Sequence, residues 1–257
     1  MPYEAITSKD NRLVKETVRL LSSAKARKQS GLFVLEGLRL CRDAVRCGCK
    51  PQTVLFTEAF YAAHREALSE ICTPAQKSYC VSDAVAQKLS DTPSPQGVFC
   101  VLQMPEQAPF GGQGKYIGLE NLADPSNLGA VARTAEALGL DGLVLFGTGC
   151  DPYAPKAQRA AMGALVRLPV YAFADFAEFS RLYPDVNTCA AVVEGGRPAN
   201  QGDFTAPCMV IVGNEANGLS EQTVLLCKQR LTLPMKGKAE SLNAAVAAGI
   251  FMWEMMR

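Results

Sequence analysis

Histidine is nearly absent from this 257-residue sequence, and its scarcity excludes several common catalytic and metal-binding designs. The only histidine, His64, lies between Tyr61-Ala62-Ala63 and Arg65-Glu66, a pattern typical of an ordinary helix surface. A Ser-His-Asp triad or a histidine-rich metal centre would have to be built around that one residue. We therefore predict no metal site and assign any proton transfer to carboxylates, lysine, tyrosine, cysteine or arginine.

Long apolar runs and a regular cysteine framework are lacking as well. No run approaches the roughly 20 apolar residues that a membrane-spanning helix needs, so we predict no membrane partner. The 10 cysteines are irregularly spaced, Cys47-Gly-Cys49 does not have a metal-binding spacing, and no charged-then-apolar leader is recognisable. We expect reduced thiols in a cytoplasmic protein.

Positive charge is concentrated near the N-terminus, although the net charge is only +1. Residues 1–50 contain 11 of the 26 Lys and Arg but only 5 of the 25 Asp and Glu. This imbalance indicates an anionic partner for the N-terminal part, and a solvated helix face is the alternative. A basic loop is expected from Ser22 to Ser30. Before it, an amphipathic helix is predicted, and its basic face consists of Lys9, Arg12, Lys15 and Arg19.

Short apolar runs alternate with helical patterns along the chain, which is typical of the α/β class. Residues 104–115 contain two prolines and three glycines and little to bury, so they read as a linker. The chain is long enough for two modest domains that each bury a core. We predict a small α/β domain over residues 1–103 and a second α/β domain over residues 116–257.

The end of the chain combines a strand, a polar loop and a helix. Pro234 stops the strand at Leu231–Leu233, and the loop that follows has a hinge at Gly237. We predict Ser241 as the N-cap of the helix. One face of this helix is apolar and partly made of small residues, namely Leu242, Ala245, Val246, Gly249, Ile250 and Trp253. A loop entering a helix can hold a ligand, and an ordinary docking helix is the alternative.

Two further polar loops follow predicted strands. The first, Glu120–Asn127, leads into a helix that carries Arg133, for which simple pairing with Glu136 is the alternative to a functional role. The second, Gly213–Gly218, follows the apolar strand Cys208–Val212, and a tight turn is the alternative there. Either loop alone is a weak signal.

Together these stretches resemble the three ordered motifs of the SpoU family of RNA 2′-O-ribose methyltransferases. The resemblance covers residues 116–256, and the first hundred residues resemble the small RNA-binding domain of many members, including Thr92 and Pro95-Gln96-Gly97. The matching residues are Asn121-Leu122-Ala123-Asp124-Pro125-Ser126-Asn127-Leu128-Gly129 with Arg133, then Gly213-Asn214-Glu215-Ala216-Asn217-Gly218, then Leu233-Pro234-Met235 with Ser241-Leu242-Asn243.

This resemblance implies a mostly parallel sheet with helices on both faces and a C-terminal trefoil knot, which pattern alone would never indicate. It also implies S-adenosylmethionine as cofactor, a homodimer whose catalytic pocket is completed across the interface, and an RNA substrate, ribosomal rather than transfer RNA. By matching position, the resemblance implies that Gly213, Leu233 and Leu242 contact the cofactor. It also implies that the catalytic pocket is lined by Asn127, Arg133, Glu215, Ser241 and Asn243. Contacts to RNA phosphates are predicted for Lys9, Arg12, Lys15 and Arg19.

The implied chemistry suits a site without histidine or metal. A sulfonium compound already carries a good leaving group, so the protein has to align the methyl group with a ribose hydroxyl and help to remove one proton. Because a guanidinium stays protonated, we assign Arg133 to positioning of the hydroxyl or a phosphate, with Glu215 and Asn127 organising it. The alternatives are a non-catalytic RNA-binding protein with the same fold and methylation of a base nitrogen.

Overall fold

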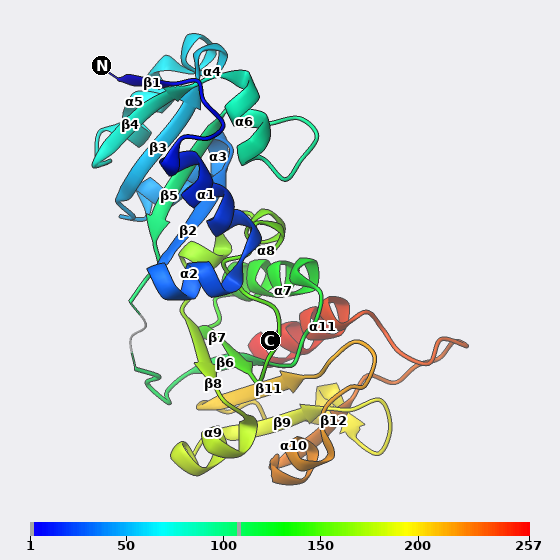
Figure 1. Ribbon diagram of the computed structural model, residues 1–257. Helices are drawn as coiled ribbons and strands as arrows, with labels where there is room; N and C mark the ends of the chain where they lie inside the picture. Colours follow the sequence, from blue (N-terminus) through cyan, green and yellow to red (C-terminus); the bar gives the residue numbers. More distant parts are fainter. Residues whose placement is uncertain (1–2, 107–108) are drawn as a thin grey trace. The chain divides into compact units, whose positions relative to one another are not determined.

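The computed structural model describes residues 3–106 and 109–257, which form two compact units (Figure 1). Unit 1 contains the described residues up to Glu106 together with Tyr153–Val166, and unit 2 contains the rest. The sequence-based division assigned Tyr153–Val166 to the second domain. Within the predicted linker 104–115, residues 107–108 lie outside the described part, and Phe110 is buried against Tyr116 with ring centroids 4.5 Å apart. This part of the linker therefore belongs to the core of unit 2.

Unit 1 is built on a five-stranded mixed sheet with the strand order β1-β4-β3-β5-β2. Strands β1, β4 and β3 run parallel, and β5 runs antiparallel to both β3 and β2. The strands are β1 (Glu4–Ile6), β2 (Leu32–Glu36), β3 (Pro51–Thr57), β4 (Lys77–Val81) and β5 (Val98–Gln103). The helices are α1 (Arg12–Ser22), α2 (Ala24–Ser30), α3 (Leu38–Arg46), α4 (Glu58–Ala63), α5 (Arg65–Cys72), α6 (Asp83–Leu89) and α8 (Pro155–Ala161), followed by the 3-10 turn η1 (Ala164–Val166).

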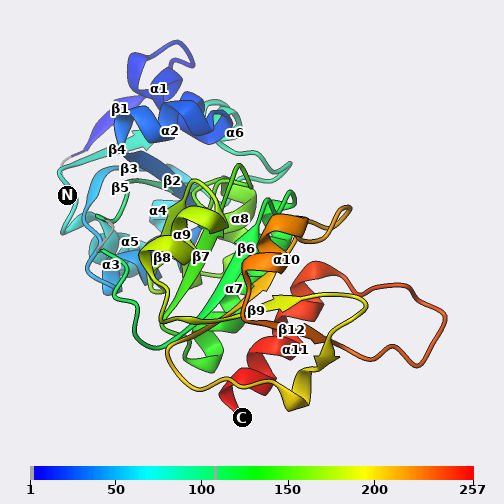
Figure 2. The same ribbon diagram turned by 90° about the horizontal axis from the view of Figure 1, so that it is seen from below.

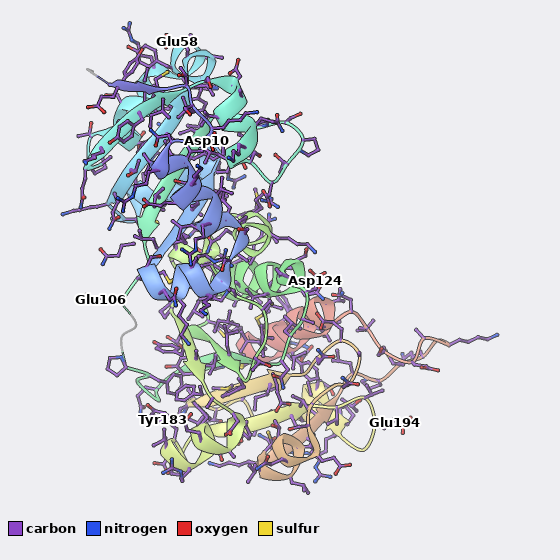
Figure 3. All side chains as sticks on the ribbon, viewed as in Figure 1. Asp10, Glu58, Glu106, Asp124, Tyr183 and Glu194 are labelled. Atoms are coloured by element: carbon purple, nitrogen blue, oxygen red, sulfur yellow. The ribbon has the colours of Figure 1, made fainter. Side chains whose placement is uncertain are left out.

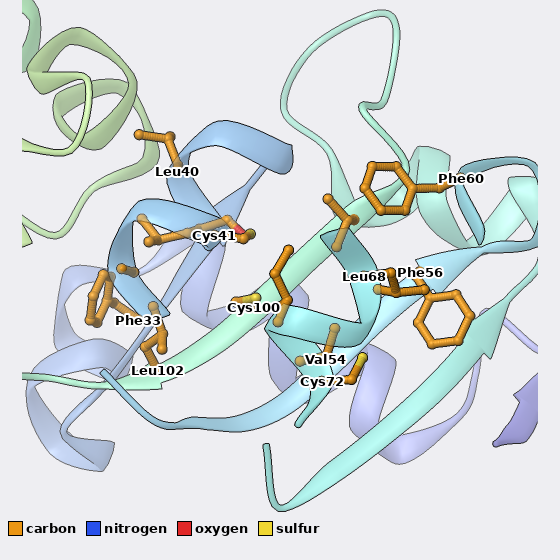
Figure 4. Close-up of a cluster of buried hydrophobic side chains, with 14 residues drawn as sticks. Phe33, Leu40, Cys41, Val54, Phe56, Phe60, Leu68, Cys72, Cys100 and Leu102 are labelled. Atoms are coloured by element: carbon orange, nitrogen blue, oxygen red, sulfur yellow. The ribbon is translucent and has the colours of Figure 1, made fainter. Parts of the chain in front are cut away.

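Alternating apolar side chains give this sheet two buried faces. On β2, Phe33 and Leu35 enter one cluster, whereas Val34 enters the other, because successive strand residues point to opposite faces. Figure 4 shows the first cluster, in which Leu40 from α3 and Leu68 from α5 cover the sheet. Helices α1 and α6 contribute to the second cluster. The predicted α/β class is confirmed for this unit.

Three local features of unit 1 differ from the sequence expectations. The expected basic loop over residues 22–30 is wrong, because Ser23 caps helix α2 and the guanidinium of the buried Arg27 donates to the Leu20 carbonyl at 2.6 Å. Strand β1 is too short to give a periodic signal. The helix predicted through His64 breaks there into α4 and α5.

Unit 2 contains a seven-stranded sheet in which all the strands run parallel, in the order β10-β12-β9-β11-β6-β7-β8. The strands are β6 (Lys115–Glu120), β7 (Gly142–Phe146), β8 (Val170–Phe173), β9 (Asn187–Ala191), β10 (Arg197–Pro198), β11 (Cys208–Val212) and β12 (Gln229–Thr232). The helices are α7 (Pro125–Leu138), α9 (Phe176–Leu182), α10 (Glu221–Leu226) and α11 (Ala244–Met256), with the 3-10 turn η2 (Ala199–Gln201).

Helices cover both faces of this sheet, as Figure 2 shows. On one face, Phe176 and Phe179 of α9 pack against Tyr116 of β6 and its neighbours. On the other, α7 and α11 pack against each other and against the central strands, and α11 buries Phe251 and Met252 there. Because all the strands are parallel, the loops after β6, β9, β11 and β12 leave the sheet at the same edge. This edge is where α/β proteins bind ligands.

Some features are lacking from the part of the chain that the structure describes. No helix in residues 3–106 and 109–257 is long and apolar enough to cross a membrane. In the same residues, no group of three His, Cys, Asp or Glu side chains could hold a metal ion. All ten cysteines are described, and none is paired in a disulfide. Burial raises the pKa of the Cys189 and Cys227 thiols to about 12, so these thiols stay protonated at neutral pH.

Candidate active site

A cavity of about 540 Å³ opens at the carboxyl ends of β9, β11 and β12. Its walls come from the three loops after these strands and from the first turns of α11. Six of the eight residues predicted to bind the cofactor or to act in catalysis line this cavity. They are Gly213, Glu215, Leu233, Ser241, Leu242 and Asn243.

The loop after β11 begins with a backbone contact that admits no side chain. A Cβ atom at Gly213 would lie 2.1 Å from the carbonyl carbon of Gly218 and 2.3 Å from the nitrogen of Leu219. The loop closes through two backbone hydrogen bonds between Asn214 and Gly218, at 3.0 and 2.9 Å. The side-chain oxygen of Asn214 also accepts from the amide of Ala216 at 2.9 Å. The result is a tight, closed turn whose backbone forms one wall of the cavity.

The carboxylate of Glu215 joins this turn to the loop after β6. It accepts hydrogen bonds from the backbone amides of Ala123 (3.1 Å) and Asp124 (3.2 Å) and from the side-chain amide of Asn127 (2.8 Å). Asp124, labelled in Figure 3, is the N-cap of α7 and accepts from the amide of Ser126 at 2.9 Å. Glu215 therefore sits beside the positive end of that helix, where a carboxylate is stabilised.

The hydrogen bonds to Glu215 set its protonation state. Burial alone would raise the pKa of this carboxyl, but the hydrogen bonds from Asn127 and the backbone amides of Ala123 and Asp124 favour the charged form. The net effect is a pKa below the usual glutamate value. Glu215 is therefore ionised throughout the neutral pH range and acts as a fixed hydrogen-bond acceptor.

Asn243 links the third loop to the same network. Its side-chain amide donates to the side-chain oxygen of Asn127 at 3.1 Å, and its own oxygen accepts from the amides of Ala245 (2.9 Å) and Val246 (3.3 Å). Asn243 is thus the N-cap of α11, and the prediction that Ser241 caps this helix is wrong. The chain is not yet helical at Ser241, which leaves that side chain on the cavity wall.

Two residues at the start of the first polar loop have supporting roles that the sequence did not assign. The carboxylate of Glu120 is buried and accepts from the hydroxyls of Ser220 (2.9 Å) and Thr223 (2.6 Å), so it ties the end of β6 to the start of α10. Asn121 has a left-handed backbone with φ of 52°, and its carbonyl accepts from the Asn214 side chain at 2.8 Å. The polar loop and the family motif include these two residues, but nothing in the sequence indicates their contacts with residues about 100 positions away.

Arg133 is not brought into the cavity of its own chain. It is exposed on α7 and does not line the cavity. It lies six positions after Asn127, which places the two side chains on different sides of the helix. Within residues 3–106 and 109–257, Arg133 has no hydrogen-bond or ion-pair partner. Glu136, its expected partner, pairs with Arg167 at 2.7 Å instead. The alternative of an Arg133–Glu136 pair is therefore wrong.

The four residues predicted to contact RNA lie in unit 1, on α1 and the turn before it. Arg12 pairs with Glu16 at 2.7 Å and Lys15 with Asp10 at 2.9 Å, while Lys9 and Arg19 have no ion-pair partner among the described residues. All four are exposed. Their role in RNA binding stays a prediction.

Comparison with known proteins identifies the family of this chain. The family model described as SpoU rRNA Methylase matches residues 114–253, which include the whole cavity. The chain belongs to the SpoU rRNA methylase family. A second model, the MRM3-like substrate binding domain, matches residues 11–100 in unit 1.

Relatives of this SpoU-family chain include proteins named as RNA methyltransferases. An uncharacterized tRNA/rRNA methyltransferase of Synechocystis sp. is 32% identical, and the match covers 98% of this chain and 93% of the relative. The 23S rRNA (guanosine(2553)-2′-O)-methyltransferase of Bacillus subtilis is 28% identical over 97% of this chain and 98% of its own. The AdoMet-bound rRNA methyltransferase of Sinorhizobium meliloti superposes with a TM-score of 0.88 at 27% identity, covering 98% of this chain and 97% of its own.

These findings confirm the predicted family and the predicted fold class with its mostly parallel sheet. A solved structure of the SpoU methyltransferase AviRb from Streptomyces viridochromogenes, in complex with the cofactor AdoMet, is also similar, with a TM-score of 0.85 at 27% identity and coverage of 96% of this chain and 97% of AviRb. The trefoil knot stays a prediction from family membership.

Proposed function

We propose that this protein transfers a methyl group from S-adenosylmethionine (AdoMet) to a ribose 2′-hydroxyl of ribosomal RNA. The observation that carries the proposal is the network in which Glu215, Asn127 and Asn243 join three sequence-distant loops beside one cavity. Relatives named as 23S rRNA 2′-O-methyltransferases and AdoMet-bound structural neighbours support it. The cytoplasmic location predicted from the cysteines is part of this proposal.

The residues of the cavity fit AdoMet. Gly213 allows its loop to close directly on the backbone of Gly218 and Leu219, so the backbone of this turn can form one wall of the cavity. Leu233, Leu242 and Phe251 supply an apolar wall, and the cavity volume of about 540 Å³ falls within the range for small-molecule sites. When bound, the sulfonium supplies an activated methyl group. The described residues around the cavity contain no candidate metal site, and the proposed transfer requires none.

The protein residues organise the hydroxyl and its proton. Glu215 holds the Asn127 side chain by one hydrogen bond, and Asn243 donates to the other end of the same side chain, so the orientation of Asn127 is fixed. Such fixed polar groups reduce the entropy cost of aligning a ribose, an effect that supplies up to about 7–11 kcal/mol in favourable cases. Ser241 adds a hydroxyl on the same wall. Arg133 is assigned to positioning of the hydroxyl or a phosphate.

Two measurements test the function. Calorimetric titration of the purified protein with AdoMet should show binding. Substitutions at Gly213 and Leu242, which are predicted to contact the cofactor, should weaken it. Ribose methylation mapped across total RNA from cells with and without the gene should reveal a missing 2′-O-methyl group in ribosomal RNA. Cofactor binding without any change in RNA ribose methylation would contradict the proposed reaction, and absence of cofactor binding would favour a purely RNA-binding role.

We further propose that the protein is a homodimer formed through α11. This helix is apolar on both sides: Phe251 and Met252 are buried, whereas Val246, Ile250 and Trp253 on the opposite side are 51%, 38% and 60% exposed. A helix that is apolar all round is normally buried on all sides. The exposed residues recur at intervals of four and three, so they form one stripe. A second copy of the chain is the occupant that the family resemblance implies.

Replacing Trp253 with glutamate is expected to dissociate this dimer. The substitution places a charge in the centre of the proposed apolar contact, where desolvation is costly. Sedimentation velocity at micromolar concentration should then show the mass of one chain instead of two. Leu225→Glu is the matched control, because Leu225 is also exposed (73%) but lies on α10. An unchanged mass for the Trp253 variant, or dissociation of the Leu225 variant alone, would contradict the assignment.

In the proposed dimer, Arg133 contributes to the cavity of the partner chain, because it does not line the cavity of its own chain. We therefore expect mixtures of the inactive Arg133→Ala and Glu215→Gln proteins to regain activity after subunit exchange. Half of the mixed population is heterodimeric and each heterodimer has one complete site, so about a quarter of wild-type activity should return. Single-turnover methylation assays before and after mixing measure it. Activity that fails to return would place Arg133 in its own chain's site, and full activity of Arg133→Ala alone would eliminate its role.

A further inference from the structure

The cavity has an unfavourable charge for an RNA substrate. Among the residues that line it are two carboxylates, Glu215 and Glu240, and no lysine or arginine. A ribose can reach this cavity only together with the phosphates on either side of it. Each phosphate carries a negative charge that the two carboxylates repel, and water screens this repulsion only in part at the mouth of a cavity. Productive binding therefore needs positive charge near the mouth.

Two lysines meet this need. Lys236 and Lys238 flank Gly237 in the loop between β12 and α11, and their loop neighbours Met235 and Glu240 line the cavity. Both lysines are exposed, and neither has an ion-pair or hydrogen-bond partner among the residues that the structure describes. The loop, drawn in orange to red, extends away from the sheet in both views (Figures 1 and 2).

Arg133 is already assigned to the hydroxyl or a phosphate, and three other cations of unit 2 are less suitable. The Lys115 ammonium donates to the carbonyl of Met255 at 2.6 Å, and the Arg197 guanidinium donates to the Gln229 side chain at 2.6 Å. Lys228 precedes β12, so it lies at the opposite edge of the sheet from the cavity. Within the chain segments 191–193, 212–218 and 233–247, which contain nearly all of the cavity lining, Lys236 and Lys238 are the only basic residues.

We propose that Lys236 and Lys238 bind the phosphates that flank the target nucleotide and hold its ribose over the cavity. This inference rests on the proposed function, because it assigns positioning residues for the same RNA. A lysine ammonium is a flexible point charge, which suits a phosphate contact that must form as the RNA enters. Phosphate contacts fix the register of a nucleic acid without reading its sequence. The two lysines thus contribute to binding of the RNA and not to the chemical step.

The test uses the full-length protein with Lys236→Gln and Lys238→Gln combined, and 23S ribosomal RNA transcribed in vitro as the probe. The slope of the logarithm of the binding constant against the logarithm of salt concentration should become shallower by about one for each lysine. The KM for RNA should rise about tenfold, while kcat at saturating RNA and the Kd for AdoMet stay within about twofold of wild type. Lys228→Gln is the matched control and should leave all four quantities unchanged.

The outcomes separate this inference from the proposed function. A double variant that binds RNA with the wild-type affinity and salt slope, while the wild-type protein binds AdoMet and methylates RNA, overturns the role of the lysines alone. A double variant that loses AdoMet binding also overturns it, because the lysines would then act on the cofactor. A wild-type protein that neither binds AdoMet nor methylates any RNA overturns the proposed function itself.

Discussion

Replacing Gly213 with alanine is expected to reduce AdoMet affinity by at least about tenfold and to abolish methylation at ordinary cofactor concentrations. The added methyl group would lie 2.1 Å from the carbonyl carbon of Gly218 and 2.3 Å from the nitrogen of Leu219. Both are backbone atoms, so no rotamer change can relieve the collision, and the turn closed by Asn214 and Gly218 has to open. Because this turn forms one wall of the cavity, opening the turn changes the shape of the cavity.

Gly237→Ala is the matched control for this effect. Gly237 lies in the loop after β12, and nothing comes within 4 Å of a Cβ atom built there. Calorimetric titration with AdoMet should therefore give a nearly wild-type Kd for Gly237→Ala and little heat for Gly213→Ala. Circular dichroism of both variants checks that the fold is kept. Equal affinities in two folded variants would show that the Gly213 turn does not form the cofactor wall.

Glu215→Gln is expected to lower kcat by about 10²-fold or more. The carboxylate accepts three hydrogen bonds, from Asn127, Asp124 and Ala123. Asp124 and Asn127 donate to one carboxylate oxygen, and Ala123 donates to the other. A glutamine has only one oxygen, so its amide group must face either Ala123 or the other two donors, and two donors repel each other. Either arrangement displaces the side chain that holds Asn127, which weakens the fixed orientation of Asn127. Rapid-quench measurement of a single turnover gives the rate constant, and the Kd for AdoMet should change much less than that rate constant.

The pH dependence of Glu215 distinguishes its role from that of a general base. Its folded-state pKa is lowered, so its contribution to stability is fully present above the usual glutamate pKa and is lost as pH falls through the lowered value. We expect the free energy of unfolding of the wild type to fall below about pH 4.5 more steeply than that of Glu215→Gln. Urea denaturation between pH 3 and 7 measures this difference. A rate profile with a neutral-range limb that disappears in Glu215→Gln would contradict the role of fixed acceptor.

Several elements could be predicted because their signals are local. Helix α6 spans Asp83–Leu89, where apolar spacing and the N-cap serine Ser82 coincide. Ser220 caps α10, and Gly139 ends α7 with φ of 79°, and both residue types are common at these helix ends. Each of these features depends on residues within one or two turns of each other. Such signals survive in a sequence without any tertiary information.

Other features depend on contacts between distant residues and could not be predicted. The hydrogen bond from Asn127 to Glu215 joins residues 88 positions apart, and the one from Asn243 to Asn127 joins residues 116 positions apart. Only the family resemblance placed these three residues in one pocket. Serine is a common N-cap, so the sequence favours Ser241, but the Asn243 side chain accepts from the first amides of α11 and also donates to Asn127.

Helix α11 touches the cavity with Ala247 and Phe251, and it carries the exposed stripe of Val246, Ile250 and Trp253 on its other side. In a dimer joined through that stripe, only this helix separates the subunit contact from the bound ligand. A shift of the helix caused by AdoMet binding would therefore also change the subunit contact, and the reverse. If the two sides are coupled, thermodynamic reciprocity requires that separation of the chains by dilution weakens AdoMet binding by the same factor by which each bound AdoMet tightens their association. Enzyme concentration would thus act as a regulator of cofactor occupancy.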